Sequence, residues 1–213
     1  MTETVARSTS SMRVAVAGAS GRMGQMLIEA VAASDDLHLA AALDAPGNAA
    51  IGSNALAATG RAGSIHITAD VRAGLADADV LIDFTRPEGT LAHIALCREL
   101  GVKAVIGTTG FTPAQKAEIA AHAEHIAIVM APNMSVGVNV VLKLLEVAAR
   151  ALDDSFDVEI VEMHHRHKVD APSGTALKMG EVVAAASGRD LQDCAVYARD
   201  GFSAPDGGAR RPG

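Results

Sequence analysis

Short apolar runs alternate with helix-length segments along most of this sequence, from Arg13 to Met130. Several runs are continuous in Val, Ile, Leu and Ala, as expected for parallel strands that are covered on both faces. This strand–helix order predicts a doubly wound α/β sheet. The predicted strands are Arg13–Ala17, Leu37–Leu43, Ser64–Thr68, Val80–Phe84, Val102–Ile106 and Ile126–Met130.

Local signals mark the ends of two helices in this region. Thr112-Pro113-Ala114-Gln115 has a capping-box pattern with Pro at the first helical position. Gly101 follows the helix that is expected to begin near Pro87, and glycine is suited to end a helix.

The pattern changes after about Asn133, which predicts a second, smaller α+β domain. Gly137–Leu152 has apolar residues at helical spacing, and another helix is expected from Ser173 to about Ala186. Between them, Phe156–Met163 is predicted to be a strand whose alternate apolar residues share one face.

The predicted domains are residues 12–133 and residues 134–199. Residues 1–11 lack the apolar stretch of a secretory signal, and residues 200–213 are rich in Gly, Pro, Ala and Arg without periodicity. We expect both segments to be disordered tails.

Composition excludes several classes of function. The formal net charge of -7 argues against a nucleic-acid surface, which needs clustered cations. No apolar run approaches the roughly 20 residues that span a bilayer, so no membrane partner is expected. Cys97 and Cys194 lie far apart without metal-ligand spacing and are interpreted as reduced thiols of a cytoplasmic protein.

The first predicted strand runs into a turn, Gly18–Gly24, whose glycines are spaced GxxGxxG. Such a turn lets the backbone approach a pyrophosphate, and the N-terminus of the next helix offers N–H groups to it. Asp44 lies 20 residues beyond Gly24, at the end of the second predicted strand. This context favours a dinucleotide-binding turn over a purely structural one.

The charge of Asp44 bears on which nicotinamide cofactor is used. A carboxylate there suits the ribose hydroxyls and would repel a 2′-phosphate, and the next residue is Ala45. Charge therefore favours NADH over NADPH, while Arg22 in the turn favours a phosphate.

A second polar turn, Gly107-Thr108-Thr109-Gly110, follows the fifth predicted strand. Ligands of such sheets bind beyond the carboxyl ends of the strands. The turn offers backbone groups and two hydroxyls to a carboxamide or a ribose, although a helix-capping loop explains the same residues equally well.

Five consecutive cationic or ionisable residues, His164–Lys168, stand out in an acidic chain. Their mutual repulsion is unfavourable unless an anion compensates it. A metal site is not predicted, because HExxH-type spacing is absent and the neighbouring Arg and Lys disfavour a cation. Ser173 is a good N-cap, so the next helix offers its N–H groups to a carboxylate. The segment suits a dianionic small molecule beside a proton donor, and the alternative is a solvated basic turn.

Five motifs occur in an order that resembles the dihydrodipicolinate reductase family. They are GASGRMG, DFTRP, GTTGF, NMSVGVN and HHRHKVDAPSGT, beginning at Gly18, Asp83, Gly107, Asn133 and His164. The resemblance covers roughly Met12 to Arg199, and the last motif is highly specific. It discriminates against a related nicotinamide-dependent reductase acting on another small dicarboxylate or imine.

The resemblance implies an N-terminal Rossmann domain and a C-terminal substrate domain. It also implies hydride transfer from NADH or NADPH to the cyclic hydroxy-tetrahydrodipicolinate or dihydrodipicolinate substrate. The product would be tetrahydrodipicolinate, in lysine and diaminopimelate biosynthesis, and family members are homotetramers.

The resemblance also assigns roles to individual residues. His164 and Lys168 match the catalytic pair, and either could donate the proton. His165, Gly174 and Thr175 match substrate contacts. The cofactor-binding residues are Gly18, Ala19, Ser20, Gly21, Arg22, Met23, Asp44, Gly107, Thr108, Thr109, Ala131, Pro132, Asn133 and Met134.

Beyond Arg199 the sequence departs from the family pattern, which implies further strands and a helix there. We therefore expect the second domain to be incomplete and the assembly region of family tetramers to be missing. The alternative function is a truncated, catalytically silent dinucleotide-binding module.

Overall fold

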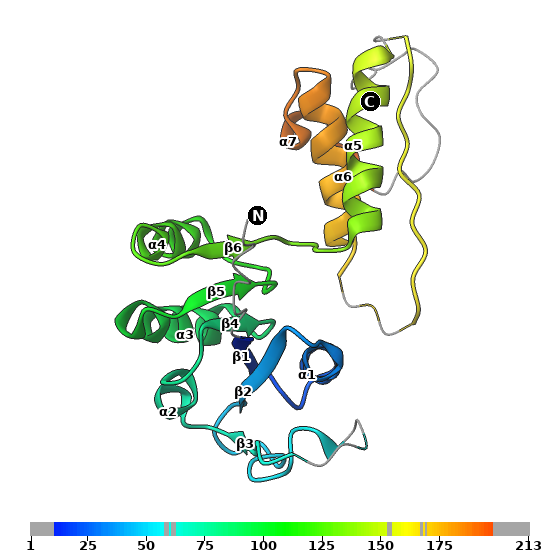
Figure 1. Cartoon of the computed structure of the whole chain (residues 1–213). Coiled ribbons are helices and arrows are strands. Elements are labelled where there is room, and N and C mark those ends of the chain that lie inside the picture. The colour runs from blue at the N-terminus through cyan, green and yellow to red at the C-terminus, as the bar shows by residue number, and fades with distance from the viewer. Residues whose placement is uncertain are drawn as a thin grey trace, which may run out of the picture. The chain divides into compact units, whose positions relative to one another are not determined.

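The computed structural model describes residues 11–57, 60, 63–152, 155–166, 168 and 170–197. The chain divides into two compact units, Met1–Pro132 and Asn133–Gly213 (Figure 1). The predicted disordered tails, residues 1–11 and 200–213, lie outside the described residues except for Ser11.

The N-terminal unit contains a six-stranded parallel sheet with the order β3-β2-β1-β4-β5-β6. This order reverses direction between β1 and β4, which makes that point the topological switch point of the sheet. The strands are β1 Met12–Ala17, β2 Leu37–Leu43, β3 Ile67–Thr68, β4 Val80–Asp83, β5 Lys103–Ile106 and β6 Ile128–Met130. The six predicted strands and the predicted fold class are confirmed, with strand ends shifted by at most three residues.

The helices of this unit are α1 Arg22–Ala33, α2 Val71–Leu75, α3 Pro87–Leu100 and α4 Pro113–Ala123. The predicted capping box is present, because the Thr112 side chain accepts a hydrogen bond from the Gln115 N–H and the Gln115 side chain accepts one from the Thr112 N–H. Gly101 ends α3 with φ of 72°, a left-handed conformation that favours glycine.

The sheet is covered on both faces, as its continuous apolar strands predict. Ala15 and Ala17 of β1 belong to a core cluster that includes Leu75 of α2 and Cys97 of α3. The alternate residues of β1 belong to a second cluster with residues of α1: Val14 and Val16 with Ile28 and Val31. This arrangement leaves the strand ends as the part of the sheet that a ligand can reach.

The described part of the C-terminal unit contains three helices: α5 Val136–Ala151, α6 Gly174–Ala186 and α7 Leu191–Cys194. The helices α5 and α6 pack side by side (Figure 1). Both α5 and α6 begin after a serine whose hydroxyl caps the first turn, which confirms the two predicted helices to within a residue. Among the described residues no helix is both long enough and apolar enough to cross a membrane.

The strand predicted at Phe156–Met163 is absent, and these described residues form no regular secondary structure. An extended segment becomes a strand only by pairing with another strand, and the other regular elements described in this unit are helices. The apolar side chains of the segment are consequently exposed, with Val161 at 88% and Met163 at 93%. A face of α5 is exposed as well, and no residue of α5 is buried.

Candidate functional site

The glycine-rich turn leads from β1 into α1 at the switch point. Gly18 has φ of 73°, and the Gly21 N–H donates to its carbonyl oxygen at 3.0 Å. A Cβ atom on Gly24 would lie 2.0 Å from that same oxygen. The close packing of α1 on the turn therefore requires glycine at this position.

The N-terminus of α1 is suited to bind an anion. Gly21 is its N-cap and provides no side-chain hydrogen bond, and the first turn contains no acidic residue. Arg22 is exposed and forms no ion pair with any described residue. N–H groups at a helix N-terminus and a nearby cation are the features that bind pyrophosphate.

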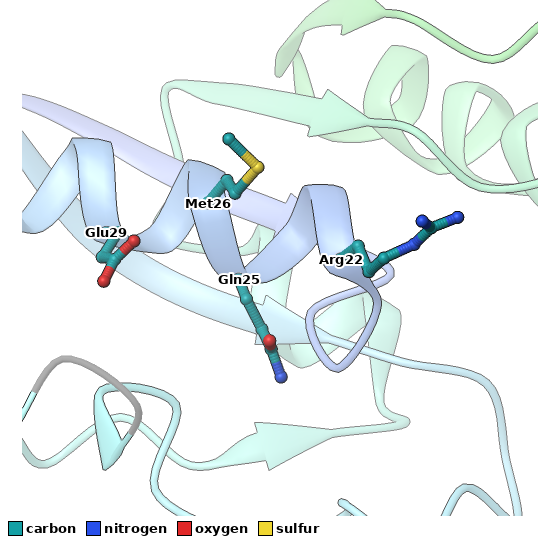
Figure 2. Close-up of a pocket in the computed structure, with 4 residues that line it drawn as sticks. All are labelled: Arg22, Gln25, Met26 and Glu29. Carbon is teal, nitrogen blue, oxygen red and sulfur yellow. The ribbon is translucent and has the colours of Figure 1, made fainter. Parts of the chain in front are cut away.

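An open hollow also lies along α1, lined by Arg22, Gln25, Met26 and Glu29. These four side chains point in different directions from the helix (Figure 2). The hollow therefore lacks the convergent polar groups that a ligand site needs.

Asp44 follows β2 and faces the glycine-rich turn. Its carboxylate accepts hydrogen bonds from the Ser20 N–H at 2.8 Å, the Ala45 N–H at 2.8 Å and the Asn48 side-chain amide at 3.0 Å. Partial burial disfavours its charged form, but the hydrogen bonds from Ser20, Ala45 and Asn48 outweigh burial and lower the pKa of Asp44. These bonds hold the charged carboxylate beside the glycine-rich turn.

Asn48 is a site residue that the sequence analysis missed. Its side-chain amide donates both to Asp44 and, at 3.0 Å, to the hydroxyl of Ser20. It therefore links the acid after β2 to the turn after β1. Its position four residues after Asp44 was the available signal, but an asparagine at that spacing is equally typical of a loop.

The turn after β5 contains Gly107 to Gly110. Thr108 is 5% exposed, and its hydroxyl donates to Asp83 at 3.4 Å and accepts from Thr90 at 2.8 Å. The expectation that two hydroxyls face a ligand is corrected, because the Thr108 hydroxyl is used inside the protein. Thr109 is exposed, and its hydroxyl bonds to no described residue. Thr108 would reach a ligand through its backbone.

The segment Ala131–Met134 spans the boundary between the two units. The Ala131 N–H donates to the carbonyl of Ile106 at 3.2 Å, which joins it to the end of β5. The Asn133 side chain accepts a hydrogen bond from the Ser135 N–H at 2.8 Å. The cofactor contacts expected for this segment stay a prediction.

In the C-terminal unit, His164 forms a hydrogen bond to a carboxylate. Its Nε2 lies 2.8 Å from Oε2 of Glu162, whose other oxygen accepts the Ser173 N–H at 2.8 Å. The hydrogen bonds from Ser173 and then from His164 lower the pKa of Glu162 to about 2. Glu162 therefore joins the predicted catalytic histidine to the start of α6.

Lys168 also has a carboxylate partner, since its Nζ lies 2.5 Å from Oδ1 of Asp170. This hydrogen bond lowers the pKa of Asp170. The cationic segment predicts an external anion that compensates its charge, but Glu162 and Asp170 already provide part of that compensation. His167 lies outside the described residues.

The N-terminus of α6 has the predicted form. Ser173 is 4% exposed, and its hydroxyl accepts the Ala176 N–H at 3.1 Å. Gly174 is exposed and Thr175 is half-buried at the first helical positions. Among the described residues, no three His, Cys, Asp or Glu side chains group in a way that could hold a metal ion.

In nicotinamide-dependent oxidoreductases the dinucleotide binds at the switch point of a Rossmann-type sheet. The features found there are a glycine-rich turn, a helix N-terminus without a side-chain cap and a charged acid. The fold and the site therefore define that class. A sequence model of the dihydrodipicolinate reductase N-terminus matches residues 12–134, and one of the C-terminus matches residues 137–208. The chain belongs to the dihydrodipicolinate reductase family.

The C-terminal match corrects the sequence analysis at one point, because it continues to residue 208 and not only to Arg199. The relatives named 4-hydroxy-tetrahydrodipicolinate reductase include those of Cupriavidus pinatubonensis and Aromatoleum aromaticum. That of Cupriavidus pinatubonensis is 64% identical over 192 residues, which are 90% of this chain and 72% of that protein. That of Aromatoleum aromaticum is 64% identical over 192 residues, which are 90% of this chain and 70% of that protein.

One solved structure supports the same family, and another shows the same fold. The dipicolinate-bound dihydrodipicolinate reductase from Paenisporosarcina sp. TG-14 is 30% identical, with a TM-score of 0.68 over 94% of this chain and 74% of that chain. An NAD binding oxidoreductase from Klebsiella pneumoniae is 18% identical, with a TM-score of 0.51 over 66% of this chain and 39% of that chain. This second likeness is one of fold.

Proposed function

We propose that this chain reduces the cyclic hydroxy-tetrahydrodipicolinate or dihydrodipicolinate substrate to tetrahydrodipicolinate, with NADH or NADPH, in lysine and diaminopimelate biosynthesis. The observation that carries the proposal is the match of both family regions, which together cover residues 12–134 and 137–208. The related Paenisporosarcina reductase is described as dipicolinate-bound, which supports a small dicarboxylate as substrate. A cytoplasmic location is part of the same proposal.

The residues of the N-terminal unit fit a dinucleotide. The turn Gly18–Met23 and Asp44 would hold the pyrophosphate and the adenine ribose. Gly107, Thr108 and Thr109, with Ala131–Met134, would meet the nicotinamide half. The bound nicotinamide supplies the hydride.

The C-terminal unit would bind the dicarboxylate and deliver a proton. The N-terminus of α6, at Gly174 and Thr175, is a favourable position for one carboxylate. Lys168 would exchange Asp170 for the other carboxylate, and His165 would add a contact. Hydride addition to an unsaturated ring leaves electron density that must be protonated, and His164 or Lys168 is the donor.

The proposal is tested by following NADH oxidation with substrate made in place by dihydrodipicolinate synthase. We expect the wild-type chain to oxidise NADH only when the synthase is active. His164→Gln and Lys168→Ala should each lower kcat by about 100-fold, the usual contribution of a general acid. The Kd for NADH, measured by titration, should stay within twofold of the wild-type value because neither residue belongs to the nucleotide turn.

The matched controls are His125→Gln, an exposed histidine of the N-terminal unit, and Lys178→Ala, an exposed lysine of α6 that pairs with Glu181. Both should retain wild-type turnover. Unchanged kcat in His164→Gln and Lys168→Ala would remove the catalytic assignment. NADH binding and cofactor-induced thermal stabilisation without any turnover by the wild-type chain would favour the silent dinucleotide-binding module.

We also propose that NADH is preferred to NADPH. The support is the position of the Asp44 carboxylate, bonded to the glycine-rich turn at Ser20, since a charged carboxylate beside the ribose repels a 2′-phosphate. We expect kcat/KM to be about tenfold higher with NADH, and Asp44→Ala to remove most of that difference. A strong NADPH preference of the wild-type chain, lost in Arg22→Ala, would instead assign the phosphate to Arg22.

A further inference from the structure

The only buried charged side chain in the described part of the chain is Asp83, and the proposed reaction gives it no role. Asp83 ends β4, which lies between β1 and β5 in the sheet. These two neighbours lead into the glycine-rich turn and into the Gly107–Gly110 turn. Asp83 therefore lies at the switch point, between the two turns that would hold the cofactor.

The Asp83 carboxylate is saturated with internal donors. Its Oδ1 accepts the Thr85 N–H at 2.9 Å and the Thr85 hydroxyl at 2.6 Å, and its Oδ2 lies 2.8 Å from Nδ1 of His93. Burial disfavours the charged form, but the hydrogen bonds from His93 and Thr85 outweigh burial and lower the pKa of Asp83. The group is therefore a carboxylate at neutral pH.

This carboxylate anchors the turn after β5. The Thr108 hydroxyl donates its hydrogen to Asp83 at 3.4 Å and accepts a hydrogen bond from the Thr90 hydroxyl of α3 at 2.8 Å. The Gly107 N–H donates to the backbone carbonyl of Asp83 at 2.9 Å. Side-chain and backbone bonds thus fix both Gly107 and Thr108, while Thr109 stays exposed.

The two residues that follow Asp83 pack against both cofactor turns. A Cβ atom on Gly18 would lie 3.1 Å from Cγ2 of Thr85, so Thr85 packs directly against the start of the glycine-rich turn. A Cβ atom on Gly107 would lie 2.0 Å from the ring of Phe84. The residues that follow β4 therefore separate and position both turns.

A purely structural role is a poor account of a carboxylate at this position. Burying an ion is unfavourable compared with burying an apolar side chain, and a satisfied polar network provides orientation in return. The oriented element here is the turn proposed to receive the cofactor.

We propose that Asp83 and Thr90 are positioning residues that act through Thr108, holding the Gly107–Thr109 backbone in the conformation that receives the nicotinamide riboside half of the cofactor. This inference rests on the proposed function. It predicts that binding of the nicotinamide half depends on the hydroxyl of Thr90, although Thr90 is buried. Binding of the adenosine half should not depend on that hydroxyl.

The test compares NADH with ADP, which lacks the nicotinamide riboside, by calorimetric titration of the full chain. Thr90→Val replaces the hydroxyl by a methyl group of similar size, and Thr90→Ala removes it without adding bulk. In both variants the Kd for NADH should rise about tenfold while the Kd for ADP stays within twofold. The reason is that the variants lose the hydrogen bond from Thr90 to Thr108, which supports only the turn proposed for the nicotinamide half. Thr90→Ser, which keeps the hydroxyl, should restore NADH binding.

Three results would overturn the inference. The first is wild-type NADH affinity in both Thr90→Val and Thr90→Ala. The second is an equal loss of NADH and ADP affinity, and the third is failure of either variant to fold while Thr90→Ser also stays impaired. In the second and third cases Thr90 would support the fold as a whole. Failure of the wild-type chain to bind NADH would overturn the proposed function itself, so the two failures are distinguishable.

Discussion

Glu162 connects two parts of the predicted substrate site at the scale of single residues. One carboxylate oxygen faces His164 and the other accepts the Ser173 N–H, at 2.8 Å each. A carboxylate bonded to one ring nitrogen of a histidine fixes the orientation of the ring. The bonded nitrogen is Nε2, so Nδ1 is the nitrogen that a proton donor role of His164 would use.

The charge of Glu162 should make the stability of the fold depend on pH. Its pKa is lowered to about 2 from the model-compound value of 4.5, so its contribution to stability is fully present above pH 4.5 and is lost as the pH falls towards 2. We expect Glu162→Gln to unfold more easily than the wild-type chain above pH 5, and the difference to shrink between pH 4.5 and 2. Urea midpoints measured by circular dichroism from pH 2 to 7 test this.

Glu181→Gln is the control for this prediction, because Glu181 is an exposed carboxylate of α6 that pairs with Lys178. Its difference from the wild-type chain should change little over the same pH range. A pH-independent difference for Glu162→Gln would contradict the assigned role of the carboxylate charge.

Among single residues, the sequence predicted those whose role follows from local spacing. Asp44 could be identified because it lies at a fixed distance from the glycine-rich turn. The roles of Asp83 and Glu162 depend on partners that are distant along the chain, such as Thr108 and Ser173. No local pattern connects such residues, so the sequence left these two carboxylates without a role.

At the scale of secondary structure, elements with their own boundary signals were predicted well. The Thr112–Gln115 capping box and Gly101 determine helix ends through bonds within a few residues. The strand predicted at Phe156–Met163 was wrong for the opposite reason. Alternation of apolar residues gives a segment the potential to pair, but the partner strand decides whether it does.

The helix α5 illustrates a related limit of periodicity. Its apolar residues predicted a helix, and Val138, Leu142 and Leu145 are half-buried along one stripe. A second stripe, with Val136, Val140, Leu144 and Val147, is exposed. Periodicity identifies which faces of a helix are apolar, but not how many of them are covered.

At the scale of the whole molecule, burial is unevenly distributed between the two units. The three apolar core clusters formed by the described residues all lie in the N-terminal unit. In the described part of the C-terminal unit, Ser173, Gly180 and Ala184 are the buried residues. Local stability follows the amount of buried apolar surface, so the units should open with different free energies.

Hydrogen–deuterium exchange read by mass spectrometry tests this difference in stability. We expect amides of α5 to exchange at least about 100-fold faster than those of α3, which is of similar length but buries Thr90, Ile94 and Cys97.

ADP at about 100 times its Kd adds roughly 2.7 kcal/mol to the stability of the unit that binds it. ADP should therefore slow exchange in β1 and β4 and leave α5 unchanged. Equal exchange of α5 and α3, or equal protection of α5 and β1 by ADP, would mean that the two units unfold as one cooperative structure.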